Sequence, residues 1–129
     1  MTDDPAHLKT LALIAHDGKK DDMVAFALAN RSVLERYELV ATRTTGHLLE
    51  EKVGLVIRKM LSGPLGGDAQ IAAQVAEGKI EAVFFFVDPL SAQPHDPDIQ
   101  GLLRICNVHN VPLATNAATA KYIISTHAL

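Results

Sequence analysis

The chain has 129 residues, of which 48% are hydrophobic and 21% charged, and its formal net charge at pH 7 is −3. This length suits a single domain, residues 1–129, that buries a core without disulfides. The slight acidity, the absence of a sustained basic run and the few aromatic residues argue against a nucleic-acid partner. No apolar run reaches the ~20 residues of a transmembrane helix, so we expect no membrane partner.

The N-terminal segment and the cysteine content indicate a cytoplasmic protein. The segment MTDDPAHLKT is acidic and lacks the apolar stretch of a signal peptide. Cys106 is the only cysteine, so no disulfide can form within the chain. Its spacing from Ile99 and Leu102 places it in phase with a buried helix face. We therefore expect a core thiol in a reducing compartment.

In chain order, short apolar runs alternate five times with helical patterns. We expect strands at residues 11–15, 39–41, 56–61, 82–87 and 111–114. The expected helices contain residues 23–27 and cover 47–53, 68–77, 98–109 and 117–125. Continuous apolar runs are typical of strands covered on both faces. The alternation predicts an α/β fold with three layers, in which helices cover both faces of a five-stranded, mainly parallel sheet.

A glycine loop, residues 62–70, follows the third expected strand. Three glycines and a proline occupy positions 63–67. Glycine lets a ligand approach the main chain, and Pro64 restricts one backbone dihedral, so this loop has a defined shape. Asp68 lies where the next helix begins. From these residues alone it is either the N-cap of that helix or a functional carboxylate.

The expected sheet brings the strand exits to one rim, where open α/β sheets bind ligands. Thr42, Thr44 and Thr45 offer hydroxyl groups ahead of a helix start, an arrangement that suits a phosphate group. Ser62 and Gly63 add a hydroxyl and an N–H group. Lys20 adds a positive charge. Strand propensity and helix capping explain the threonines equally well, and no nucleotide-binding glycine motif is present.

Five ionisable side chains follow the strands toward the same rim: His16, Asp68, Asp88, His95 and Asp98. Each one alone is also explained as a cap or turn residue, and the two Asp-Pro pairs are good turn formers. Together they suit proton abstraction next to a ketone, in which a carboxylate takes the proton and a histidine stabilises the oxyanion. No spacing matches a metal-ligand set, so we expect no metal.

Six segments resemble methylglyoxal synthase: AHD at 15–17, TRTTG at 42–46, LSGPLGGD at 61–68, FVDPL at 86–90, PHDPD at 94–98 and PLATN at 112–116. The resemblance covers about residues 11–125, and SGPLGGD together with PHDPD is highly specific. It implies a lyase that converts dihydroxyacetone phosphate to methylglyoxal and inorganic phosphate without a cofactor. It also implies a homohexamer that phosphate inhibits.

Carried over by position, the resemblance makes Asp68 the catalytic base and His95 the group that polarises the substrate carbonyl. It makes Asp88 and Asp98 supporting residues of this acid–base centre. The substrate and phosphate contacts that it implies are His16, Lys20, Thr42, Thr44, Thr45, Ser62 and Gly63. Arg43 stands where relatives often have a small residue, so its side chain either points away or joins the anion site.

One alternative is a non-catalytic regulatory domain of the same fold, as in carbamoyl-phosphate synthetase, which binds a phosphorylated effector. Such a domain needs the anion site but not Asp68 and His95 together. The chain also stops at Leu129, whereas many relatives continue with a basic tail near a neighbouring subunit. From this difference we expect weaker communication between subunits.

Overall fold

The structure is a computed structural model that describes residues 9–125. The acidic N-terminal residues 1–8 and the chain end at Leu129, on which two expectations above rest, lie outside the described residues. Within residues 9–125, no helix is both long and apolar enough to cross a lipid bilayer.

Five parallel strands form one sheet in the order β3-β2-β1-β4-β5. The strands are β1 (Thr10–Ala15), β2 (Glu38–Ala41), β3 (Arg58–Lys59), β4 (Ala82–Phe86) and β5 (Leu113–Ala114). The chain runs from β1 outward to β3 and then returns to β4 on the other side of β1. The predicted parallel sheet is confirmed, and its order reverses between β1 and β4.

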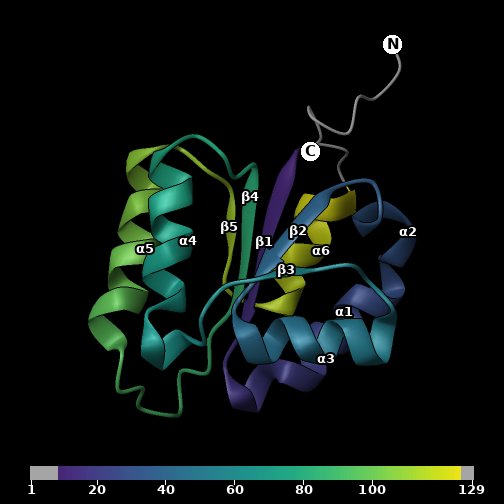
Figure 1. The fold of residues 1–129 in the computed structure, drawn as a ribbon, viewed down its shortest axis with the longest axis horizontal. Helices are drawn as coiled ribbons and strands as arrows, with labels where there is room; N and C mark the ends of the chain where they lie inside the picture. Colours follow the sequence, from purple (N-terminus) through teal and green to yellow (C-terminus); the bar gives the residue numbers. More distant parts are fainter. Residues whose placement is uncertain (1–8, 126–129) are drawn as a thin grey trace.

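Helices cover both faces of this sheet, as predicted (Figure 1). One face packs against α1 (Lys20–Ala29), α3 (Arg43–Val53) and α6 (Ala117–Ser125), and the short α2 (Arg31–Leu34) follows α1. The other face packs against α4 (Gly67–Ala76) and α5 (Asp96–Val108). Successive strand side chains point to opposite faces, so Phe84 and Phe86 join the first core and Phe85 the second. Cys106 is buried in the second core, as predicted.

The two edge strands are shorter than expected. β3 spans only Arg58–Lys59 and β5 only Leu113–Ala114. Each edge strand pairs with only one neighbouring strand. Residues just before and after the paired positions have no strand on the other side to hold them in the sheet. Val56, which we expected inside a strand, is 90% exposed. Hydrophobic composition alone therefore overstated the length of these strands.

Three helices begin earlier than expected, and this changes the roles of their first residues. α3 begins at Arg43 with Thr42 at its N-cap position, so the threonines lie in the first turn rather than in a preceding loop. α4 begins at Gly67, because Gly66 adopts the left-handed φ of 106° that glycine tolerates. Asp68 is thus inside the helix, and the N-cap interpretation of Asp68 is wrong. α5 begins at Asp96.

The position of Asp98 follows from that last start. Pro97 lies in the first turn of α5, where proline is favoured because its missing N–H needs no partner. The N-cap position belongs to His95, whose carbonyl accepts the Asp98 N–H at 3.0 Å. The expectation that Asp98 caps this helix is therefore wrong.

Gly67 provides a test of how closely the glycine loop packs. A Cβ atom at Gly67 would lie 1.9 Å from the Leu61 carbonyl oxygen. Gly67→Ala is therefore expected to lower the free energy of unfolding by about 1–3 kcal/mol, as overpacking does. Gly101→Ala is the control, because a Cβ there meets nothing within 4 Å. In the α5 helix it should stabilise by about 0.5–1 kcal/mol. Urea unfolding measures both, and a Gly67→Ala variant as stable as wild type would contradict this packing.

Candidate active site

The carboxyl ends of β1 and β2 open into a cavity of about 220 Å³, here called the substrate cavity. Its other walls come from the glycine loop and from the loop between β4 and α5. The predicted site residues that line it are His16, Lys20, Thr42, Thr44, Ser62, Gly63, Asp68 and His95. The cavity lies beside the strand-order reversal, where open α/β sheets bind ligands.

Asp68 and His95 form a buried acid–base pair in this cavity. The Asp68 side chain is 1% exposed and that of His95 8% exposed, and Asp68 Oδ2 lies 3.4 Å from His95 Nε2. Neither Asp68 oxygen has a hydrogen-bond partner among the described residues. Burial raises the pKa of Asp68, the Asp98 charge raises it further, and His95 acts in the opposite direction. A desolvated carboxylate with a raised pKa is a stronger base than a solvated one.

His16 lies on another wall of the cavity. Its Nδ1 accepts a hydrogen bond from the Asp88 backbone N–H at 2.9 Å, and its Nε2 has no partner within residues 9–125. The ring is perpendicular to that of His95, with centroids 6.1 Å apart. Burial lowers the pKa of His16, and the positive charges of His95 and Lys20 lower it further.

Other groups that line the cavity suit an anion. Lys20 Nζ donates hydrogen bonds to the Ala15 carbonyl at 2.8 Å and to Asp17 Oδ1 at 2.9 Å, which holds the ammonium group at the cavity wall. Thr44 and Ser62 contribute hydroxyl groups. The first-turn N–H groups of α3 have no acceptor within the helix. A phosphate group would therefore find a positive charge, hydroxyl groups and N–H donors together.

The substrate cavity thus combines groups suited to proton transfer with groups suited to anion binding. A family model described as the MGS-like domain matches residues 22–115. The chain is 60% identical over 118 residues to a methylglyoxal synthase of Thermus thermophilus, covering 92% of this chain and 94% of the relative. The chain belongs to the methylglyoxal synthase family.

Two further relatives agree with this assignment to the methylglyoxal synthase family. The methylglyoxal synthase of Clostridium botulinum strain Alaska E43 is 57% identical over 114 residues, covering 88% of this chain and 96% of the relative. The crystal structure of methylglyoxal synthase from Elizabethkingia anophelis NUHP1 has a TM-score of 0.86 and 47% sequence identity. That match covers 92% of this chain and 78% of the other.

Four predicted site residues of this family member lie outside the cavity lining: Arg43, Thr45, Asp88 and Asp98. Thr45 is buried beneath it, where its hydroxyl bonds the backbone of Ala15. Arg43 is exposed at the start of α3. The Asp88 carboxylate accepts the Leu90 N–H, and Asp98 is half-buried and acts on Asp68 through its charge.

Sequence reasoning missed three contributions to the site. Gln93 lines the cavity but is a polar residue in a polar loop, which gives no signal. Asp17 pairs with Lys20, and the three-residue spacing of opposite charges was an available signal. Gly63 lies against His95, since a Cβ there would be 2.7 Å from Nε2.

Among the described residues, no three His, Cys, Asp or Glu side chains are grouped to hold a metal ion.

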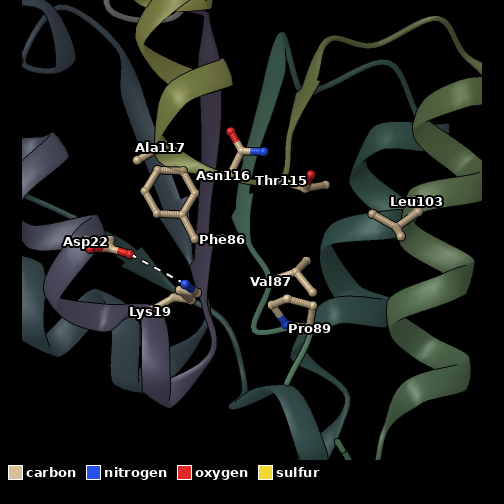
Figure 2. Close-up of a pocket in the computed structure, with 9 residues that line it drawn as sticks. All are labelled: Lys19, Asp22, Phe86, Val87, Pro89, Leu103, Thr115, Asn116 and Ala117. Atoms are coloured by element: carbon tan, nitrogen blue, oxygen red, sulfur yellow. Dashed lines mark ion pairs between the residues drawn. The ribbon is translucent and has the colours of Figure 1, made fainter. Parts of the chain in front are cut away.

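A second cavity of about 410 Å³ lies next to the ends of β4 and β5 (Figure 2). Its walls are mainly apolar, and Lys19 reaches its rim from an ion pair with Asp22 at 3.9 Å. Thr115 and Asn116, which follow the carboxyl end of β5, line this cavity and not the substrate cavity. The adjacent residues Lys19 and Lys20 therefore serve different cavities.

The raised pKa of Asp68 predicts a pH-dependent cost of folding. A carboxyl group whose pKa is raised by folding stabilises the folded state at pH values below its ordinary pKa near 3.8. This contribution is lost as the pH rises through the pKa of the folded state. Asp68→Asn is therefore expected to raise the free energy of unfolding at pH 7, with a gain that shrinks toward pH 4. Urea unfolding across pH 4–8 measures this.

Asp21→Asn is the matched control for that measurement. Asp21 is exposed in the first turn of α1, where a carboxylate is favoured by the helix dipole. Its replacement should therefore give no stabilisation at pH 7. If Asp68→Asn behaves like Asp21→Asn, the burial of an ionisable Asp68 carries no such cost.

Proposed function

We propose that this protein is a methylglyoxal synthase, a carbon–oxygen lyase that converts dihydroxyacetone phosphate to methylglyoxal and inorganic phosphate. The observation that carries this proposal is the buried Asp68–His95 pair in a cavity that also holds Lys20. The relatives named above are methylglyoxal synthases that align over nearly their whole length. The substrate has a ketone next to an acidic C–H and a phosphate, so it needs both sets of groups in this cavity.

The first step is proton abstraction by Asp68 from the hydroxymethyl carbon of the substrate. The C–H electron pair becomes the carbon–carbon double bond of an enediolate, and the carbonyl oxygen takes the negative charge. His95 donates a hydrogen bond to that oxygen. General base catalysis typically contributes about 10²–10⁴ in rate. A donor to the oxyanion contributes about 10²–10³.

The second step breaks the C–O bond to phosphate. The hydroxyl oxygen on the former hydroxymethyl carbon forms the aldehyde C=O and gives its proton to the departing phosphate. The enediolate C=C electron pair moves to a new double bond with the phosphate-bearing carbon, and the phosphate leaves with the C–O electron pair. Protonated Asp68 then returns its proton to the resulting enolate, which gives the enol of methylglyoxal. This elimination requires the C–O bond to lie out of the enediolate plane. A triose isomerase forms a similar enediolate but must prevent the loss of phosphate from it. Lys20, Thr42 and Thr44 hold the phosphate and stabilise its charge as it leaves. The enol product then tautomerises to methylglyoxal.

The regulatory-domain alternative uses only the anion-binding groups of this cavity. A module that binds a phosphorylated effector needs Lys20 and the threonines. It has no use for a carboxylate buried without hydrogen bonds, because that burial is unfavourable for the charged form. The acid–base pair therefore favours the enzyme.

The same anion-binding groups support one finer proposal. Inorganic phosphate, as a product, competes with the substrate for Lys20 and the threonines and so inhibits the enzyme. We also propose a homohexamer, on the resemblance to the family, and a cytoplasmic location, on that resemblance and on the single cysteine.

Asp68→Asn tests the proposed chemistry directly. The amide cannot accept a proton, so kcat should fall by at least about 10²–10⁴-fold, while inorganic phosphate still binds. The assay incubates enzyme with dihydroxyacetone phosphate and measures both released phosphate and the dicarbonyl product. Calorimetry measures phosphate binding. A wild-type chain that releases no phosphate would overturn the proposed function, and a variant with near wild-type turnover would overturn the role of Asp68.

Lys20→Ala and Lys19→Ala form a matched pair that tests the anion-binding groups. Lys20 lines the substrate cavity, whereas Lys19 lines the apolar cavity beside it. Lys20→Ala should therefore weaken both substrate binding and competitive inhibition by phosphate, and Lys19→Ala should change neither markedly. Steady-state inhibition constants for phosphate report the difference. A larger effect of Lys19→Ala would contradict the placement of the phosphate group.

A further inference from the structure

The Asp88 carboxylate organises the turn that follows β4. Its Oδ1 accepts the Leu90 N–H at 3.0 Å, which closes an Asx turn across Pro89. Its Oδ2 packs against Gly18, where a Cβ atom would lie only 2.4 Å away. The carboxylate does not line the substrate cavity. Its contacts instead hold the backbone of Asp88 in one orientation.

In this orientation the Asp88 backbone N–H donates to His16 Nδ1 at 2.9 Å. A backbone amide nitrogen can only donate, so Nδ1 must carry a lone pair. The ring proton of neutral His16 is then on Nε2. This Nε2 is buried and has no partner in the part of the chain that the structure describes, although His16 lines the substrate cavity. It is therefore a buried hydrogen-bond donor without an acceptor among the described residues.

The charges around His16 favour the neutral ring. Burial is the largest influence lowering its pKa, and His95 and Lys20 lower it further. The carboxylates of Asp88 and Asp17 act in the opposite direction and are weaker influences. The ring also packs against that of Phe85, nearly perpendicular to it and with centroids 5.2 Å apart, which keeps water from that side. A protonated ring would in addition lose the bond to the Asp88 N–H, because Nδ1 would then carry a proton.

We propose that Asp88 is a positioning residue that fixes His16 as the Nε2–H tautomer, so that His16 is a second, neutral hydrogen-bond donor to the enediolate oxygen. This inference rests on the proposed function. Two donors, His16 and His95, then face the oxygen that gains charge in the first step. A neutral imidazole can polarise a carbonyl through a hydrogen bond without carrying a positive charge into the cavity.

The tautomer is measured directly by two-bond proton–nitrogen correlation spectra of protein labelled with ¹⁵N-histidine at pH 7. The His16 signals are identified by their loss in His16→Gln. We expect the nitrogen shift of an unprotonated acceptor at Nδ1 and of a protonated nitrogen at Nε2. A proton on Nδ1, or an imidazolium ring at pH 7, would overturn the inference.

Asp88→Asn and Asp88→Ala then separate the turn from the charge, because both remove the charge and only asparagine keeps the Oδ1 acceptor. Asp88→Asn should keep the Nε2–H tautomer and most of kcat. Asp88→Ala should give averaged tautomer shifts at His16 and a lower kcat, with a smaller change in KM. Equal spectra and equal kcat in the two variants would overturn the positioning role.

Replacements of His16 test the donor itself. The amide nitrogen of His16→Gln can occupy the Nε2 position, whereas His16→Asn is too short to reach it. His16→Asn should lower kcat by about 10²–10³-fold, and His16→Gln by less. Equal losses would overturn the donor role. A wild-type chain with the expected tautomer but no lyase activity would instead refute the proposed function, so the two failures are distinguishable.

Discussion

The burial of the Asp68 carboxylate is the constraint on which the rest of the site depends. An ionised carboxylate without hydrogen bonds is costly to bury, and Asp68 is 1% exposed with no hydrogen bond to either oxygen among the described residues. The fold supports this cost through two apolar cores, one on each side of the sheet. α4 holds Asp68 in its first turn, and His95 at the start of α5 supplies the compensating contact. Because burial disfavours the charged form of Asp68, it raises the pKa of this carboxyl group and makes the carboxylate a stronger base.

Close approach between segments explains the glycines at three positions in and around the site. Gly67 lies against the Leu61 carbonyl, which brings the start of α4 next to the residue that precedes the glycine loop. Gly63 leaves room for the His95 ring, and Gly18 leaves room for the Asp88 carboxylate. A side chain at any of the three positions would displace a neighbour. The glycines act here through missing volume, whereas Gly66 acts through its left-handed backbone.

The two histidines of the cavity are held by different means, and this separates their roles. His16 is fixed by a backbone N–H, which sets the position of its proton. His95 is fixed by packing on Gly63 and by its ion pair with Asp68. One ring is therefore defined as a donor by the main chain. The other ring lies next to the Asp68 carboxylate, with 3.4 Å between Nε2 and Oδ2.

The sequence by itself determined the order of strands and helices, the parallel sheet and the rim on which the chemistry collects, because periodicity and strand exits are local properties. It could not determine helix starts or side-chain directions at that rim. Thr45 lies beneath the cavity because its hydroxyl bonds the backbone of Ala15, 30 positions away. Lys19 and Lys20 are neighbours in the sequence, but the folded loops place them in the linings of two different cavities. The Asp88 N–H meets His16 across 72 positions. Such contacts depend on where the sheet brings distant segments together, and only the tertiary structure decides that.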